Sequence, residues 1–510
     1  MRFAREALGL AVLLVAGVVG AEERPQATFA FIVGVNRSVD ADELPLRYAD
    51  DDAARYQDLF RLLGARTYLL ARMDQNTERL HPQAAAETSV PNWGEWQRLV
   101  EQLTRDVAQA RARNLGTVVY FIYAGHGSVH NGQGYVTLED RRLTGEDLAK
   151  GLIQRVEADQ VHLIVDACSS YFLAYGRGPG GQRRPLKGFS EVAQLSEDGR
   201  VGLLLSTSSA RASHEWEAFQ SGVFSHEVRS GLYGAADVDG DGRVSYREIA
   251  AFVERANAAI PNERFRPQVH ARPPKDGTWL VVLGKAMEHR IEVDGQEAQH
   301  LRLEDSRGVR LADFHNASGQ RTWLARPIGT GPLYLRRMGD GREYRIDSMP
   351  EVVQLAALTP QQARTADRGA EHEAFSLIFS LPYDRQVVDA YDFQAPVLLE
   401  AEPARRRPTW RRVAGWSALG LAGASLGGGL WTTLSAREAR SGNRATLPHA
   451  EAMGQNQRIR TLNHRSTTLY VAGALAAGAG LGMLLWPGAP AEALPVAGPD
   501  LAGVQLGGRF

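Results

Sequence analysis

The stretch VVYFIYAGHG, residues 118–127, decides how the fold of this chain is interpreted. Its first residues are apolar and β-branched or aromatic, which is typical of a strand that is buried on both faces of a sheet. The run ends in His126, which stands between Gly125 and Gly127. Because glycine has no side chain, these flanks let the backbone come close to a bound molecule. We therefore expect the histidine to be presented at the surface of the sheet rather than packed inside it.

A second apolar run, VHLIVDA, is followed directly by Cys168. Further runs of strand type, TFAFIVGV at 28–35 and VGLLLSTS at 201–208, alternate with amphipathic helical patterns. This alternation predicts an α/β fold with a mostly parallel sheet that is flanked by helices on both faces. In such sheets the chemistry gathers at the carboxyl ends of the strands, which is where both His126 and Cys168 stand.

The composition excludes several classes of protein and site. A length of 510 residues is enough for two or three domains. The charge is balanced, with Lys+Arg 58 against Asp+Glu 59, so we expect no nucleic-acid partner. The single cysteine excludes an intramolecular disulfide and any metal site that is built on several thiolates.

A thiol beside an imidazole has a chemical use. The imidazole promotes formation of the thiolate, which is the nucleophile, and can later protonate a leaving amine. The backbone amides of Gly127 and Cys168 could hold an oxyanion. Taken singly, each residue has a simpler explanation: Cys168 could be a small core residue, and His126 could be a turn residue.

The stretches VVYFIYAGHG and HLIVDACSS together resemble the catalytic blocks of the caspase-like cysteine peptidases, the clan of caspases and metacaspases, and most closely their bacterial members. The resemblance spans about half the chain and implies a caspase-like domain over residues 27–272. It implies that Cys168 is the nucleophile and His126 the general acid and base of an endopeptidase that acts on proteins or peptides. The alternative is a catalytically weak or inactive scaffold or sensor that uses the same fold for binding.

The residue two positions before the nucleophile bears on specificity. In metacaspases an acid at this position helps to line a pocket for Arg or Lys, and here it is Asp166. Asp52 resembles the second pocket acid, although acids at a helix start also cap the helix. The resemblance therefore implies cleavage after basic residues.

A Gly/Pro-rich segment after the cysteine would then be open to self-cleavage, or would simply be a solvated basic loop. Its basic residues are Arg177, Arg183, Arg184 and Lys187.

The stretch DVDGDGRVSYRE, residues 237–248, carries the full pattern of an EF-hand calcium loop. Calcium is the one cofactor that we predict, and we expect no organic cofactor. The ion would pin the last helix of the peptidase domain or gate activity; an acidic turn without a ligand is the alternative. The predicted ligands are Asp237, Asp239, Asp241, the carbonyl of Arg243, Ser245 and Glu248.

The remaining segments predict further domains and a location. Short alternating strands predict a small all-β, sandwich-like accessory domain at 278–349, with a connector at 350–412. A basic start, an apolar stretch and small residues predict a signal peptide at 1–21.

Two charge-free stretches predict a C-terminal transmembrane helix hairpin. The prediction is of a bacterial inner-membrane protein with its peptidase domain in the periplasm; the oligomeric state is not predicted. The hairpin comprises helices at 413–436 and 466–486, a cytoplasmic loop at 437–465 and a tail at 487–510.

Overall fold

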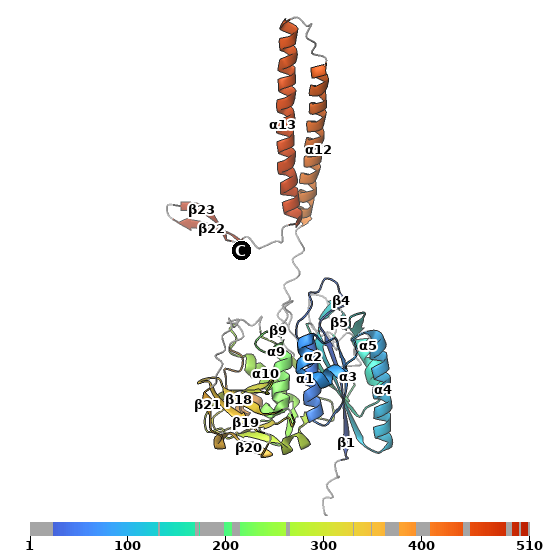
Figure 1. Ribbon diagram of the computed structural model, residues 1–510, viewed down its shortest axis with the longest axis vertical. Coiled ribbons are helices and arrows are strands. Elements are labelled where there is room, and N and C mark those ends of the chain that lie inside the picture. The colour runs from blue at the N-terminus through green and yellow to red at the C-terminus, as the bar shows by residue number, and fades with distance from the viewer. Residues whose placement is uncertain are drawn as a thin grey trace, which may run out of the picture. The chain divides into compact units, whose positions relative to one another are not determined.

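The computed structural model divides the chain into two units, Met1–Glu400 and Ala401–Phe510 (Figure 1). It describes residues 24–130, 133–168, 173, 198–206, 215–261, 266–329, 331–347, 349–362, 377–393, 409–441, 449–485, 492–498 and 501–507. The predicted signal peptide and the predicted self-cleavage residues Arg177, Arg183, Arg184 and Lys187 lie outside the described residues.

A six-stranded sheet organises the first unit. Five of its strands run parallel, and only the edge strand β12 runs antiparallel to its neighbour β8. The α/β fold with a mostly parallel sheet is therefore confirmed. In spatial order the strands are β12 (Val269–Arg272), β8 (Val201–Ser206), β7 (Gln160–Asp166), β3 (Gly116–Gly125), β1 (Gln26–Val35) and β2 (Arg66–Ala71).

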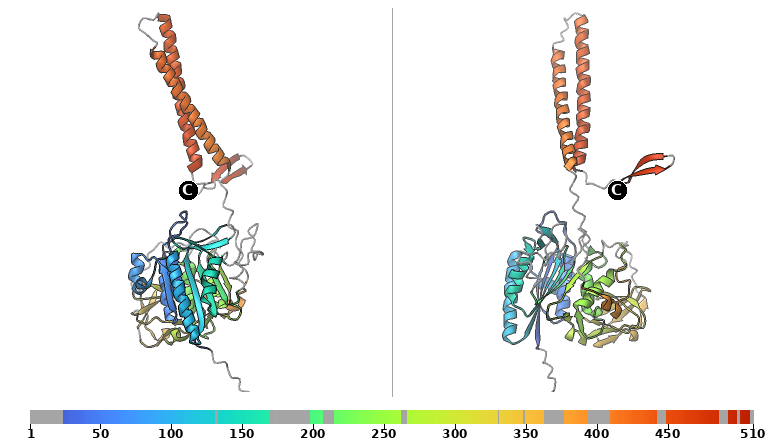
Figure 2. Two further views of the ribbon diagram at one scale, coloured as in Figure 1. Left: turned by 90° about the vertical axis from the view of Figure 1, so that its right-hand side faces the viewer. Right: turned by 180° about the vertical axis from the view of Figure 1, so that it is seen from behind.

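Helices cover both faces of this sheet (Figure 2). Successive residues of β1 point to opposite faces, so that Ala30 joins one core and Phe31 the other. The first core includes α1 (Ala49–Leu62), α9 (Val223–Ser230), η3 (Gly231–Ala235) and α10 (Tyr246–Asn257). The second includes α4 (Trp93–Ala112), α5 (Gly145–Leu148), η1 (Ala149–Ile153) and α6 (Gln154–Val156).

Several short elements near the strand ends escape the sequence patterns. They are α2 (Gln75–Leu80), α3 (Pro82–Glu87), the three-stranded sheet of β4 (Gly127–His130), β5 (Gln133–Thr137) and β6 (Arg142–Thr144), and the pair β9 (Glu215–Trp216) and β10 (Ser221–Gly222). We call residues 215–222, with β9 and β10, the 215–222 hairpin. It leads directly into α9.

The β-rich part of the chain forms two small sheets. One has the order β17 (Thr322–Ala325), β14 (Arg290–Val293), β20 (Val352–Gln354). The other has the order β16 (Arg310–Asn316), β15 (Gln299–Glu304), β18 (Leu333–Arg337), β19 (Arg342–Ile346), β21 (Gln361–Gln362). Because one hydrophobic core contains both Phe314 of β16 and Phe252 of α10, this part packs directly on the α/β domain.

The boundaries of the β-rich part differ from the predicted ones. The TWLVVLG stretch, predicted as its first strand, forms β13 (Trp279–Val282), which pairs with β11 (Arg243–Ser245) of the predicted calcium loop. The predicted connector 350–412 contains β20, β21, η6 (Leu355–Ala357) and α11 (Arg385–Ala390), and η5 (Gly284–Glu288) precedes β14.

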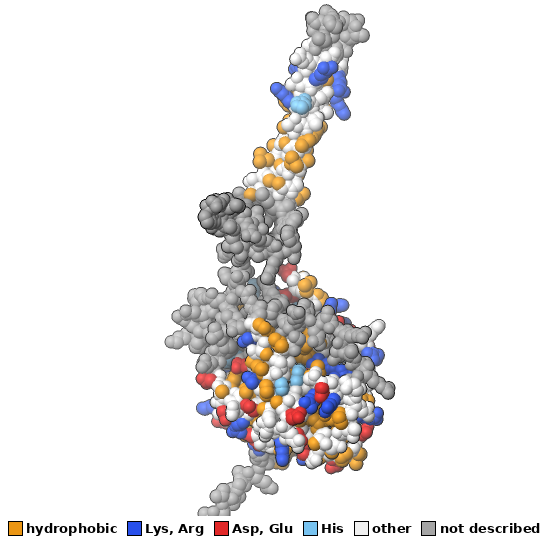
Figure 3. Space-filling view, turned by 90° about the vertical axis from the view of Figure 1, so that its left-hand side faces the viewer, with side chains coloured by type: hydrophobic (Ala, Val, Ile, Leu, Met, Phe, Trp, Pro, Cys, Tyr) orange, Lys and Arg blue, Asp and Glu red, His pale blue; other side chains and the backbone are white. Residues whose placement is uncertain are grey.

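The second unit contains a pair of long helices, α12 (Thr409–Ser441) and α13 (His449–Leu485). Small residues at a spacing of seven lie buried between them. On α12 these are Gly415, Ala422, Gly429 and Ala436, and on α13 they are Ser466, Gly473 and Gly480. Large apolar side chains such as Trp431 and Leu475 are exposed instead. Figure 3 shows hydrophobic side chains on the outer surface of this helix pair.

The predicted transmembrane helices need correction. Among the described residues, no helix has a stretch long and apolar enough to cross a membrane. The physical reason is that the charge-free stretches at 413–436 and 466–486 are rich in Gly, Ala, Ser and Thr, which have low hydropathy. The predicted loop 437–465 is also largely helical, and the predicted tail holds the paired strands β22 (Glu492–Gly498) and β23 (Leu501–Gly507).

Candidate active site

His126 and Cys168 follow the ends of two neighbouring strands. In the parallel pair β3 and β7, Ala124 is the register partner of Asp166, and each candidate residue stands two positions further along its own segment. The two segments also approach closely, because a Cβ atom on Gly127 would lie 2.5 Å from the Cys168 carbonyl oxygen. Glycine at 127 is therefore required for this approach, and the structure brings both predicted residues to one edge of the sheet.

Tyr123 supports the histidine from inside the sheet. Its hydroxyl lies 2.9 Å from the carbonyl oxygen of His126 and 2.8 Å from that of Thr137. The side chain passes directly beneath Gly125, where a Cβ atom would lie 2.6 Å from the same hydroxyl. The sequence pattern counts Tyr123 only as one more strand residue, and its role in fixing the backbone at His126 is visible only in three dimensions.

Burial favours the neutral forms of both candidate groups, His126 and Cys168. Desolvation lowers the pKa of His126 below 6.5, although Glu43, the backbone of Asn36 and Asp40 act in the opposite direction. Desolvation, and to a smaller extent the charges of Asp166 and Glu43, raise the pKa of the Cys168 thiol to about 11. The buried His126 Nε2 atom has no hydrogen-bond partner among the described residues. Near pH 7 the site thus contains a protonated thiol and a neutral imidazole whose Nε2 atom could accept a proton.

The predicted pocket acids Asp166 and Asp52 also lie close together. Asp166 ends β7, and its Oδ2 atom accepts hydrogen bonds from the amide of Ser225, at 3.0 Å, and from its hydroxyl, at 2.7 Å. Asp52 lies in the first turn of α1 and accepts a hydrogen bond from the amide of Gly222 at 2.8 Å. A Cβ atom on Gly222 would lie 2.6 Å from Asp166 Oδ2 and 3.2 Å from Asp52 Oδ2, so this glycine stands between the two carboxylates.

The two carboxylates differ in how their charge is balanced. Asp52 forms an ion pair with Arg229, at 3.0 Å between Oδ1 and Nη2, and both side chains are almost fully buried. Asp166 is held by the neutral donors of Ser225, and desolvation raises its pKa to about 7. Arg229 is a residue that the sequence patterns miss; it lies in α9, where every residue is buried, the charged Glu227 included.

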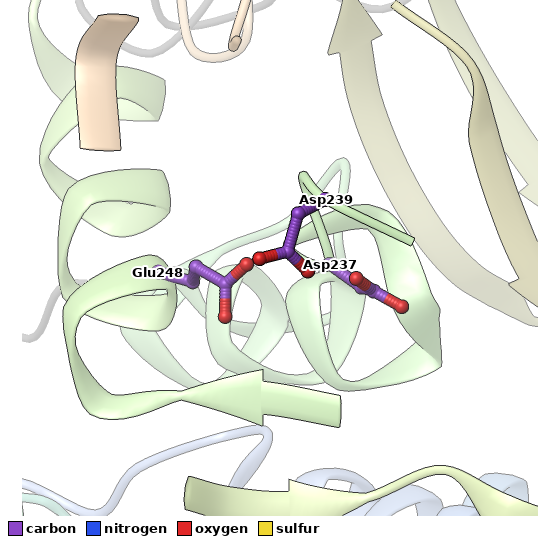
Figure 4. Close-up of side chains that lie close together, drawn as sticks. All are labelled: Asp237, Asp239 and Glu248. Carbon is purple, nitrogen blue, oxygen red and sulfur yellow. The ribbon is translucent and has the colours of Figure 1, made fainter. Parts of the chain in front are cut away.

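The predicted calcium loop brings three of its carboxylates together (Figure 4). One carboxylate oxygen from each of Asp237, Asp239 and Glu248 lies within 4.8 Å of the others, and Asp241 lies outside this group. Ser245 begins α10 as its N-cap, so the loop runs into a helix as an EF-hand loop does.

Backbone amides hold this loop in shape. Asp237 accepts hydrogen bonds from the amides of Gly240, at 2.8 Å, and Gly242, at 3.0 Å. Gly242 has a φ of +77°, which favours glycine at this position of the loop. The amide of Arg243 donates to Asp241 at 2.8 Å. Carboxylate oxygens gathered in this way are the ligands that calcium prefers.

Comparison with known families agrees with the geometry. Residues 27–273 match the family model of the caspase domain of the C14 peptidases. Residues 27–273 are therefore a caspase-like cysteine peptidase domain, as the two strand-end motifs indicate. A peptidase domain of this kind implies protein or peptide substrates. No curated protein matches the chain.

Proposed function

We propose that this protein is a cysteine endopeptidase in which Cys168 is the nucleophile and His126 is the general base and acid. The observation that carries the proposal is the register of β3 and β7, which sets both residues at equivalent positions past the strand ends. His126 takes the proton of the Cys168 thiol as the sulfur attacks the carbonyl carbon of the scissile bond. The amides of Gly127 and Cys168 are the proposed donors to the resulting oxyanion. His126 then protonates the leaving amine, and water hydrolyses the thioester.

Cleavage after Arg or Lys is the specificity that we propose. It is supported by the position of Asp166, which ends the same strand that leads to Cys168 and, within the described part of the chain, accepts hydrogen bonds from Ser225 rather than from an arginine. A carboxylate in a largely desolvated pocket recognises a guanidinium or ammonium group by charge-assisted hydrogen bonds. Asp52 contributes to the pocket through Gly222, although its own charge is balanced by Arg229.

Calcium binding at residues 237–248 is a further part of the proposal. Asp237, Asp239 and Glu248 would supply carboxylate oxygens, and a divalent cation would relieve the repulsion between them. Asp241, the Arg243 carbonyl and Ser245 complete the proposed ligand set. Because Ser245 begins α10 and β11 pairs with β13, an ion here would stabilise the last part of the peptidase domain.

Export and self-processing complete the proposal. Residues 1–21 have the basic, apolar and small-residue order of a signal peptide, which would carry the peptidase domain out of the cytoplasm. The basic residues between 177 and 187 would be substrates for the enzyme's own pocket. An active enzyme in which this segment stays intact would contradict self-processing.

A non-catalytic scaffold is the second candidate function. The observation that favours it is the burial of Cys168, which raises the pKa of the thiol to about 11 and lowers its reactivity at neutral pH. Alkylation of Cys168 by iodoacetamide separates the candidates. We expect a rate for the peptidase that depends on pH and falls in His126→Ala. Slow labelling that is the same in His126→Ala, together with no peptide hydrolysis, would favour the scaffold.

A further inference from the structure

The 215–222 hairpin forms one side of the proposed substrate pocket. Besides the Gly222 amide, the Ser221 hydroxyl donates a hydrogen bond to Asp52. At the other end of the hairpin, Glu215 accepts hydrogen bonds from the backbone amides of Arg47, at 3.0 Å, and Tyr48, at 2.8 Å. The position of this short segment therefore determines how the groups around Asp52 and Asp166 are arranged.

The β-rich part of the chain reaches this hairpin through Arg310 of β16. Its Nη1 atom donates a hydrogen bond to the carbonyl oxygen of Ala218 at 3.1 Å, and its guanidinium lies 4.4 Å above the ring of Phe219. The same guanidinium makes two hydrogen bonds to Asp313, at 2.5 and 2.6 Å. Arg310 is 8% exposed and Asp313 is fully buried, so these contacts are shielded from water.

Asp313 makes a second connection to the peptidase domain. Its Oδ2 atom lies 2.8 Å from Nε2 of the buried His226, and the His226 ring stacks on Phe219 with 4.1 Å between the centroids. His226 directly follows Ser225, which holds Asp166. The backbone amide of Asp313 also donates to Ser230 on the same helix, at 3.0 Å. One pair of residues on β16 thus contacts both the hairpin beside Asp52 and the helix that holds Asp166.

Local packing of the peptidase domain does not explain why charged groups are buried here. Burying an arginine and an aspartate costs free energy unless their geometry and hydrogen bonds are well satisfied, and an apolar pair is often at least as stable. The Arg310–Asp313 pair is satisfied by partners that lie on the 215–222 hairpin and on α9. These are the two segments that carry the donors to the proposed pocket acids.

We propose that Arg310 and Asp313 are positioning residues for substrate recognition, and that the β-rich part is thereby an integral component of the peptidase. The pair fixes the 215–222 hairpin and the start of α9, and through them the surroundings of Asp52 and Asp166. The inference rests on the proposed function for the identity of the pocket. It replaces the expectation of a separate accessory domain.

The test compares Arg310→Met with Arg326→Met in the full-length chain. Arg326 is a matched control because it is also buried in the β-rich part, where it donates to the carbonyl oxygens of Asp347 and Pro350. We expect Arg310→Met to raise KM for Arg-ending peptides about tenfold while kcat changes less than about twofold. We also expect faster hydrogen exchange of the amides of residues 215–222 in this variant. Arg326→Met should change neither quantity.

Two further arms keep the test decisive. If Arg310→Met does not fold, Arg310→Lys keeps a cation beside Asp313 but lacks the planar fork, and it should show a smaller rise in KM. If the wild type hydrolyses no peptide, the proposed function fails, and hydrogen exchange alone decides whether the pair fixes the hairpin. Equal KM values and equal hairpin exchange in the Arg310 and Arg326 variants would overturn the inference.

Discussion

His126 and Cys168 occupy equivalent positions beyond two hydrogen-bonded parallel strands, each two residues past the register pair Ala124 and Asp166. Two segments far apart in sequence therefore deliver a base and a thiol to the same edge of the sheet. The same register places Asp166 close to Cys168, which links the proposed catalytic pair to the proposed specificity pocket. The catalytic pair, the substrate pocket, the calcium loop and the packing of the helical hairpin can each be tested experimentally.

The pH dependence of kcat/KM should distinguish the titration of His126 from that of Asp166. His126 accepts a proton only when neutral, and burial lowers its pKa. Protonation of His126 should therefore reduce activity only below pH 6.5. Asp166 must be charged to bind a basic residue, and burial raises its pKa to about 7, so recognition of Arg weakens as the pH falls through this value. We expect the acid limb of kcat/KM to begin near pH 7 in the wild type and below 6.5 in Asp166→Asn. Identical limbs would contradict the assignment to Asp166.

Replacement of Asp166 should weaken recognition of basic residues specifically. A charge-assisted hydrogen bond is worth about 1.5–3 kcal/mol, so Asp166→Asn should lower kcat/KM for Arg-ending peptides roughly 10- to 100-fold. The control is the rate of Cys168 alkylation, compared at pH values where the two proteins have the same fraction of thiolate. This rate should change little if His126 and Cys168 keep their arrangement. An unchanged preference for Arg over uncharged residues would show that Asp166 does not form the pocket.

Removal of the Asp52 charge should affect stability more than chemistry. Asp52→Asn leaves the buried Arg229 without its anion, and breaking a buried pair in this way costs about 3–5 kcal/mol. Asp198→Asn is the matched control, since Asp198 pairs with Arg200 at a partly exposed position, where a pair is worth about 0–1 kcal/mol. Urea denaturation measures both. Similar losses in the two variants would mean that Arg229 does not depend on Asp52.

The proposed calcium loop can be tested through a neighbouring arginine. Arg385 on α11 lies 3.2 Å from Asp239 and would compete with a bound ion. We expect Arg385→Ala to lower the Kd for calcium about two- to fivefold, and Glu248→Gln to raise it by about two orders of magnitude. Arg345→Ala serves as the control, because Arg345 pairs with Asp347, away from the loop. Calorimetric titration that detects no calcium binding to the wild type would contradict the site.

The helical hairpin should be sensitive to residue size only on its inner face. A Cβ atom on Gly480 would lie 2.9 Å from the carbonyl oxygen of Gly415, whereas nothing lies within 4 Å of one on Gly478. Gly480→Leu should therefore separate α12 from α13 and speed hydrogen exchange of their facing amides about tenfold or more. Gly478→Leu should leave the exchange almost unchanged. Equal exchange rates in the two variants would contradict this packing.

The sequence predicts those parts of the fold that depend on local pattern. The strands β1, β3, β7 and β8 are burial-driven apolar runs, and the match of residues 27–273 to the caspase domain confirms the family that their ends indicate. The contacts that shape the pocket have no local signature. Arg229 meets Asp52 across 177 positions, and Arg310 meets Ala218 across 92. Periodicity reports which face of an element is buried, but not which distant residue it meets.

For the C-terminal helices, a local sequence pattern was present but led to a wrong prediction. Freedom from charge is a feature that membrane-spanning helices share with closely packed helix pairs rich in small residues, and the sequence interpretation gave it too much weight. The seven-residue spacing of Gly415, Ala422 and Gly429 indicates a helix pair, whereas the low hydropathy of these residues counts against a span. Spacing together with summed hydropathy would have separated the two interpretations.

Hydrolysis of Arg-, Lys- and Asp-ending fluorogenic peptides by the full-length protein, with and without calcium and beside Cys168→Ala, tests the central claim most directly. The account predicts cleavage after Arg and Lys that disappears in Cys168→Ala, with little cleavage after Asp. Cleavage that persists in Cys168→Ala, or no cleavage by the wild type under any of these conditions, would contradict it.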